Sequence, residues 1–228
     1  MKLSEEMKNK TLLSFELFPP KTEKGLQNLP GTIDHLMKYN PSHISCTHGA
    51  GGGNVGANRE VCQMIKNAGT TPVTHFTVIK NTKEGIKEQL DQYLADGVDH
   101  MLALRGDIPL GETTTCGDFD YATDLVKFVR DTYGDKFEIA VAGSPEGHIS
   151  CRSLESDIAV LKQKQDNGAD YIMTQLCWDM EQFKYWLDAI RKAGITMPVD
   201  VGVMPILDQA ATINMALSRN GCVMEREL

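Results

Sequence analysis

Arg105 and Asp107 are the two side chains whose types and spacing most directly suggest chemistry. They follow the apolar run 101–104, with Gly106 between them. Because side chains alternate along a strand, we expect both charges to lie on one side at the end of a buried strand. Pro109 then ends that strand, since it cannot donate to a neighbouring strand. The pair predicts either a functional site or an ion pair that closes a strand end.

Five other expected strands also end in polar residues. These are Glu16, Thr47 with His48, His75, Glu146 with His148, and Gln175 with Asp179. In an α/β barrel the C-terminal ends of the strands converge on one mouth, where active sites are built. A purely structural explanation would have to place the same bias on six strands independently, so the pattern favours a site.

Glu16 is the candidate general acid among these residues. Phe15, Leu17 and Phe18 flank it. Apolar neighbours remove water from a carboxyl and raise its pKa, so we expect Glu16 to be protonated near neutral pH. The structural alternative is a glutamate that pairs with a lysine or arginine at the mouth.

A metal site is not expected from the histidines and cysteines. Cys46 and His48 share one side of a strand, whereas His43 faces away from them. His148 and Cys151 supply only two ligands, which do not make a site.

The elements that must position these residues recur in a βα pattern of roughly thirty residues. Strands are expected at 12–18, 43–47, 72–79, 101–109, 137–142, 171–176 and 198–204. Seven strands fit a doubly wound sheet or a (β/α)₈ barrel without its last unit. The dinucleotide motif Gly-x-Gly-x-x-Gly does not follow the first strand, which favours the barrel.

Helices are expected after each strand, and their caps can be read from the sequence. Pro30 should interrupt the first helix, which would resume at Thr32. Asn81 with Glu84 is expected to form a capping box. Ser153 and Asp179 should cap two later helices. The last helix is expected over 209–219.

Composition limits the classes of partner. The 228 residues carry a net charge of −8, which argues against binding to nucleic acid or to an anionic membrane. No signal-peptide segment begins the sequence, and no apolar run is long enough to span a bilayer. The six cysteines are widely spaced, as in proteins of a reducing cytoplasm. We expect one cytoplasmic domain over 1–228.

Six motifs together carry a family resemblance. They are Phe-Glu-Leu-Phe-Pro-Pro-Lys-Thr (15–22), Cys-Thr-His-Gly-Ala-Gly-Gly (46–52), Ala-Leu-Arg-Gly-Asp-Ile-Pro (103–109), Pro-Glu-Gly-His (145–148), Lys-x-Lys-x-x-x-Gly-Ala-Asp (162–170) and Thr-Gln-Leu-Cys-Trp-Asp (174–179). In this order the sequence resembles 5,10-methylenetetrahydrofolate reductase of the bacterial, single-domain type.

The resemblance implies a TIM barrel that holds FAD at the C-terminal ends of its strands and reduces methylenetetrahydrofolate to methyltetrahydrofolate, in one-carbon metabolism and methionine biosynthesis. It implies Glu16 as the general acid that opens the folate ring. It also implies Asp107 near flavin and pterin, and Gln175 as a contact to folate and nicotinamide. The flavin contacts that it implies are Thr47, His48, Ala50, His75, Arg105, Gly106, Asp107, Ala122, His148, Cys151, Asp157 and Lys164.

The sequence also departs from the family. Ser144 stands where many relatives carry an aromatic residue, and Val160 and Gln163 replace polar and cationic residues near the ribityl-phosphate. The family continues through an eighth strand after the last residue here, so we expect a barrel that is C-terminally incomplete, or closed by a partner or a second copy, as a homo-oligomer or hetero-complex.

Two alternatives to the reductase stay open. One is a non-catalytic flavin- or pterin-binding subunit of a larger complex. The other is a lyase or aldolase on the same barrel, with Lys80 as the nearest lysine for Schiff-base chemistry. The electron donor of a reductase is also open between NADH, NADPH and a partner electron-transfer protein.

Overall fold

The computed structural model describes residues 2–48, 55–108 and 111–217. The chain separates into two compact units, Met1–Ala140 and Val141–Leu228, and the boundary falls inside strand β5. Each unit is described by itself. The single domain expected from the sequence therefore stays a prediction.

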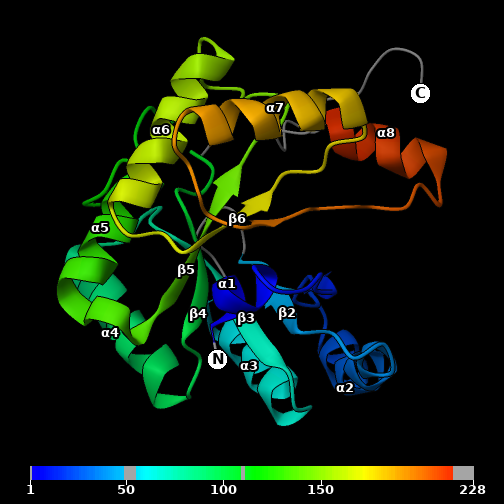
Figure 1. Ribbon diagram of the computed structural model, residues 1–228. Coiled ribbons are helices and arrows are strands. Elements are labelled where there is room, and N and C mark those ends of the chain that lie inside the picture. Colours follow the sequence, from blue (N-terminus) through cyan, green and yellow to red (C-terminus); the bar gives the residue numbers. More distant parts are fainter. Residues whose placement is uncertain (1, 49–54, 109–110, 218–228) are drawn as a thin grey trace. The chain divides into compact units, whose positions relative to one another are not determined.

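Strands and helices alternate along the chain (Figure 1). The first unit contains α1 (Leu3–Met7), β1 (Ser14–Leu17), α2 (Glu23–Met37), β2 (His43–Cys46), α3 (Val55–Asn67), β3 (Thr71–Thr77), α4 (Lys83–Ala95), β4 (His100–Leu104), α5 (Ala122–Tyr133), the 3₁₀ turn η1 (Gly134–Lys136) and the start of β5 (Glu138–Gly143). The second unit contains the end of β5, α6 (Leu154–Asp166), β6 (Tyr171–Thr174), α7 (Met180–Lys192), β7 (Val199–Asp200) and α8 (Gln209–Leu217).

The strands pair in chain order, from β1 to β7. The β1–β2, β2–β3, β3–β4 and β6–β7 pairs are parallel. A doubly wound sheet reverses its strand order at a switch point, whereas a TIM barrel keeps chain order. The α/β class, the seven strands and the barrel-type order are confirmed.

The core of the first unit lies where α3 and α4 cover β2 and β3. Ile44 and Phe76 on the strands, Ile65 on α3 and Leu90 on α4 are fully buried there. Burying a side chain of this size contributes about 1.5–3 kcal/mol. In the second unit, Trp186 is fully buried, and a Cβ atom on Gly143 would come within 3.0 Å of its ring. Trp186 is therefore part of the core of this unit.

The sequence-based helix boundaries were wrong in two places. Helix α2 runs without a break through Pro30, which lies on its exposed side, while Leu29 and Ile33 are buried. Packing of the buried face offsets the lost hydrogen bond. The cap of α4 is Thr82, which accepts from the Gly85 N–H at 3.1 Å, and not Asn81.

The caps predicted on α6 and α7 are confirmed. The Ser153 hydroxyl accepts from the Ser156 N–H at 3.2 Å, and the Asp179 carboxylate accepts from the Glu181 and Gln182 N–H groups. The Gln182 side chain takes no part in this cap, since it donates to the Pro145 carbonyl at 2.8 Å. Among the helices in the described residues, none is long and apolar enough to cross a lipid bilayer.

Candidate active site

The C-terminal ends of β1 and β3 bring Glu16 and His75 together. Side-chain alternation along β3 places His75 and Thr77 on one face, while Thr74 lies on the opposite face, toward α3. Glu16 belongs to the first of these faces, because its Oε2 lies 3.5 Å from Nε2 of His75. This is a pair that the sequence predicted to share a site.

His75 is neutral at physiological pH. Burial, and then the nearby His48, lower the pKa of His75 from 6.5 to about 4. Burial also lowers the pKa of His48. A neutral imidazole does not form an ion pair with a carboxylate, so the contact between His75 and Glu16 is not a salt bridge at physiological pH.

The desolvation of Glu16 expected from its apolar neighbours is not observed. Its side chain is 45% exposed. Phe15 and Leu17 precede and follow it in β1, and alternation turns them to the other face of the strand. Neighbours in sequence therefore do not enclose this carboxyl, which stays accessible to a substrate.

Three buried side chains at the C-terminal ends of β2 and β3 have polar atoms without a hydrogen-bond partner among the described residues. These atoms are both ring nitrogens of His48, Nε2 of His75 and Oγ1 of Thr77. The three residues are 8%, 7% and 2% exposed. An unpaired buried polar group costs about 1–3 kcal/mol, so native proteins keep such groups mainly where they serve a function.

Arg105, Gly106 and Asp107 follow β4 rather than belonging to it. The strand ends at Leu104, and Gly106 has a φ of +87°, which turns the chain. The strand expected to reach Pro109 is therefore shorter, and the placement of Arg105 and Asp107 on one side stays a prediction. The Arg105 Nε donates to the Gly106 carbonyl at 3.2 Å, and Asp107 is exposed.

The second unit assembles four of the predicted cofactor contacts. Asp157, on α6, accepts from the His148 backbone N–H at 3.3 Å and lies 3.6 Å from the Cys151 Sγ. Lys164, two turns further along α6, donates from Nζ to the Ala142 carbonyl at 3.0 Å. Burial lowers the pKa of Lys164, and the Asp157 carboxylate opposes this shift. The pKa of Cys151 is raised by burial and then by Asp157.

The other predicted site residues lie at element ends. Gln175 follows β6, and its Oε1 accepts from the Leu176 N–H at 2.8 Å. Ala122 is the first residue of α5, and Thr47 directly follows β2. Ala50 lies outside the described residues. The roles of these residues stay predictions.

Sequence reasoning missed two residues at this site. Thr77 could have been found, because it lies two positions after His75 and so shares its face. Asn58 gave no signal, since a single polar residue near the start of a helix is typical of a solvated surface. In the structure it is fully buried and bonded to the end of β2.

Comparison with known proteins identifies the family to which the chain is similar. The family model for methylenetetrahydrofolate reductase matches residues 2–220. Methylenetetrahydrofolate reductase (NADH) 1 of Arabidopsis thaliana is 38% identical over 219 residues, which are 90% of this chain and 37% of that protein. The 5,10-methylenetetrahydrofolate reductase of Escherichia coli is 33% identical over 202 residues, covering 88% of this chain and 67% of that protein. The chain thus spans little more than a third of the length of its plant relatives.

Solved structures support the fold alone. A 2,3-dimethylmalate lyase aligns with a TM-score of 0.59 at 13% sequence identity, covering 99% of this chain and 88% of that chain. A phosphonopyruvate hydrolase aligns with a TM-score of 0.60 at 10% identity, covering 94% of this chain and 74% of that chain. Identities this low say nothing about shared chemistry. By the extent of the family match and its identity to the E. coli protein, the chain belongs to the methylenetetrahydrofolate reductase family.

Proposed function

We propose that this chain reduces 5,10-methylenetetrahydrofolate to 5-methyltetrahydrofolate with FAD as the hydride carrier. The observation that supports this most strongly is the unpaired, buried set of His48, His75 and Thr77 at the ends of β2 and β3, with Glu16 beside His75, in a chain of this family. The relatives are named as reductases of this substrate, and the plant enzymes as users of NADH.

The chemistry of these residues suits a flavin. Two neutral imidazoles and a hydroxyl, all of them buried, can each donate or accept a hydrogen bond. This capacity matches the alternating carbonyls and ring nitrogens of an isoalloxazine. Within the second unit, taken by itself, Lys164 and Asp157 have the donor and acceptor groups that suit phosphate and hydroxyl groups. When bound, FAD supplies a hydride from its reduced ring.

Glu16 acts as the general acid in this proposal. It donates a proton to the folate nitrogen, so that the five-membered ring opens and the methylene carbon becomes able to accept hydride. His75 at 3.5 Å is neutral and makes no ion pair with this carboxyl. A positioned acid of this kind contributes about 10²–10⁴-fold in rate.

Asp107 and Gln175 are proposed to hold the substrate, and Asp107 also to tune the flavin. Arg105 and Gly106 are proposed to contact FAD. NADH or NADPH is the proposed donor, with a partner electron-transfer protein as the alternative. The place of action is proposed to be the cytoplasm, where folate cofactors and nicotinamides are available, in a homo-oligomer or a hetero-complex.

The test is reconstitution of the purified chain with FAD, followed by a turnover assay with methylenetetrahydrofolate and NADH or NADPH. The proposal expects the chain to acquire a visible flavin spectrum and to form methyltetrahydrofolate. Uptake of FAD without turnover, also with reduced flavin supplied chemically, would support the non-catalytic binding subunit instead. Failure to take up FAD would overturn both.

A further inference from the structure

Asn58 is a fully buried amide near the start of α3, and both ends of its amide group make hydrogen bonds. On one side, Nδ2 donates to the carbonyl of Cys46 at 2.9 Å and to the carbonyl of Thr47 at 3.0 Å. These are two consecutive carbonyls at the C-terminal end of β2. A single amide group therefore fixes two successive peptide planes at the point where the strand ends.

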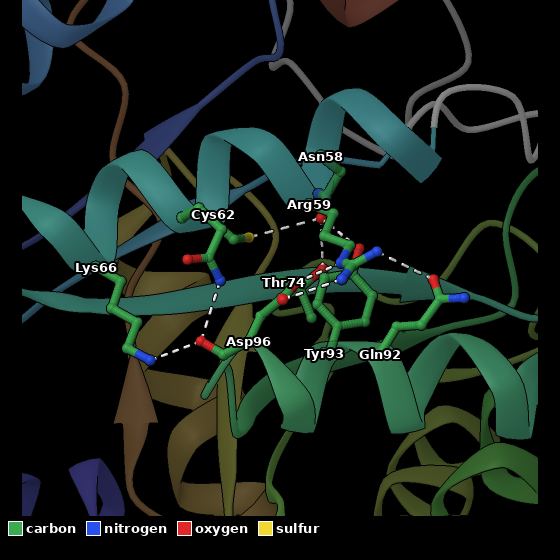
Figure 2. A network of polar contacts seen from close by, with 9 residues as sticks. Asn58, Arg59, Cys62, Lys66, Thr74, Gln92, Tyr93 and Asp96 are labelled. Carbon is green, nitrogen blue, oxygen red and sulfur yellow. Dashed lines mark hydrogen bonds and ion pairs between the residues drawn. The ribbon is translucent and has the colours of Figure 1, made fainter.

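The other side of Asn58 anchors this amide to two further elements. Its Oδ1 accepts from the Thr74 hydroxyl on β3 and from the Tyr93 hydroxyl on α4, both at 2.7 Å. The Cys62 Sγ lies 3.6 Å from the same oxygen. Figure 2 shows these side chains gathered around Asn58 between α3, β3 and α4.

The orientation of the amide follows from its partners. A flipped amide would set Oδ1 against two carbonyl oxygens, which only accept hydrogen bonds, and would lose both contacts. In the observed orientation the amide uses its donors on the carbonyls and its acceptor on the hydroxyls. Few other side chains could replace it: leucine has the size without the polarity, and an ionised aspartate has no donor for the carbonyls.

We propose that Asn58 is a positioning residue of the site, which sets the end of β2 and thereby the placement of Thr47 and His48. The carbonyl that it holds belongs to Thr47, so it fixes the peptide that leads into His48. Thr74, whose hydroxyl donates to Asn58, immediately precedes His75 on β3. One buried side chain thus ties together the chain segments beside both histidines of the unpaired set.

This inference rests on the proposed function for its meaning, but its structural part can be tested separately. Asn58→Asp keeps the acceptor for the two hydroxyls and, when ionised, has no donor for the carbonyls. Tyr93→Phe is the matched control, since it removes one contact from the opposite side of the same amide and leaves both carbonyl bonds in place. Asn58→Leu is the second variant, should Asn58→Asp not fold.

The first measurement is hydrogen exchange in the protein without FAD. The Thr47 N–H donates to the Leu17 carbonyl at 2.9 Å, and the Val78 N–H donates to the Leu104 carbonyl at 3.2 Å. In Asn58→Asp we expect exchange at Thr47 to become about ten-fold faster or more, because two carbonyl bonds behind it are lost. Exchange at Val78, and exchange at Thr47 in Tyr93→Phe, should stay within about three-fold of the wild type.

The second measurement is the Kd for FAD together with the shape of the bound flavin spectrum. We expect Asn58→Asp to raise the Kd about ten-fold or more at about pH 8, and to change the spectrum, while Tyr93→Phe changes neither. Burial raises the pKa of an aspartate at this position, and its protonated form regains one donor. The FAD affinity of Asn58→Asp should therefore recover in part at about pH 6, relative to the wild type.

The inference is overturned if Asn58→Asp, or Asn58→Leu in its place, affects FAD binding no more than Tyr93→Phe does. It is also overturned if exchange at Thr47 is unchanged. A wild-type chain that binds no FAD would contradict the proposed function instead, and the exchange experiment would still decide whether Asn58 holds the strand end.

Discussion

Two buried histidines in the first unit lie beside carboxylates at opposite ends of the strands, and they behave in opposite ways. His75, near the C-terminal end of β3, has a pKa lowered to about 4 and lies 3.5 Å from the partly exposed Glu16. His100, at the N-terminal end of β4, has a pKa raised to about 9. Both rings are largely buried, so burial alone does not explain the difference.

The second histidine differs because it lies between two carboxylates. Burial would lower the pKa of His100, but Asp99 at 2.7 Å from Nδ1 and Glu138 at 2.9 Å from Nε2 more than offset this. Glu138 in turn accepts from the Leu3 and Ser4 N–H groups, each at 2.7 Å. Burial opposes these contacts, which nevertheless lower the pKa of Glu138 to about 2.

The N-terminal and C-terminal ends of the strands therefore differ in how their buried polar groups are paired. Around His100 each ring nitrogen lies within 2.9 Å of a carboxylate oxygen, and the cluster ties helix α1 to the starts of β4 and β5. Around His75 several buried polar atoms lack a partner within the described residues. In a barrel-type fold, polar groups at the N-terminal ends of strands serve stability and those at the C-terminal ends serve function. The contrast predicts which substitutions reduce activity and which reduce stability.

The largest effect is expected for Glu16→Gln. Without an acid to protonate the folate, methylenetetrahydrofolate reduction should fall about 10²–10⁴-fold. Reduction of the flavin by the electron donor and the melting temperature should stay near the wild type, because the Glu16 side chain is 45% exposed. Separate assays of the two half-reactions check this. Loss of both half-reactions together would show that Glu16 is structural.

Glu138→Gln should have the converse effect. Removing one partner of a buried ion pair costs about 3–5 kcal/mol in the free energy of unfolding, here because His100 keeps its charge and α1 loses its cap. Denaturant unfolding measures the loss. FAD binding by the protein that remains folded should be unchanged, and a weaker affinity with unaltered stability would contradict the division between the two ends.

The pH dependence of stability sharpens the same contrast. The pKa of His100 is raised from 6.5 to about 9, so its contribution is complete below pH 6.5 and is lost as the pH rises through 9. The pKa of Glu138 is lowered from 4.5 to about 2, so its contribution is complete above pH 4.5 and is lost as the pH falls through 2. Stabilisation by the cluster is therefore greatest between pH 4.5 and 6.5.

The measurement is the free energy of unfolding of the wild type and of His100→Gln, from pH 4.5 to above pH 9. The difference between them should be greatest between pH 4.5 and 6.5, and should shrink by about 3 kcal/mol as the pH rises past 9. A difference that does not change with pH would show that His100 is not charged in the folded protein.

The smallest effect is expected for a matched pair of threonines. Thr77 is buried with no partner for its hydroxyl in the described part of the chain, whereas the Thr70 hydroxyl donates to the Pro41 carbonyl at 2.9 Å. Thr77→Val should leave stability unchanged or slightly increased and weaken FAD binding about three- to ten-fold. Thr70→Val should cost about 1 kcal/mol of stability and leave FAD binding unchanged. Equal effects on FAD binding would remove Thr77 from the site.

Much of the fold could be predicted because it depends on local signals. Apolar runs, terminal glycines and capping residues such as Ser153 and Asp179 act within a few positions of one another. The end of a strand was less predictable: β4 stops at Leu104 although the sequence allowed it to reach Pro109, since hydrogen bonds with neighbouring strands set its length. Pro30 was misread because packing of Leu29 and Ile33 outweighs its effect on the helix.

The candidate site was predictable in its residue types but not in its environments. Glu16 and His75 were placed together correctly, yet the expected burial of Glu16 failed because the flanking apolar residues face the other way. Helix α1 was missed since its N-terminal N–H groups are capped by Glu138, which lies 135 positions from Leu3 in the sequence. Asn58 was missed for the same reason, as its partners come from distant elements.

The most direct test of the account is the second half-reaction, followed by the visible flavin band. The FAD-loaded chain is reduced without oxygen and mixed with methylenetetrahydrofolate. The account predicts that the wild type and Glu138→Gln reoxidise the flavin and form methyltetrahydrofolate, whereas Glu16→Gln does not. Flavin that stays reduced in the wild type, or that reoxidises equally well in Glu16→Gln, would contradict the assignment of the active site to this end of the strands.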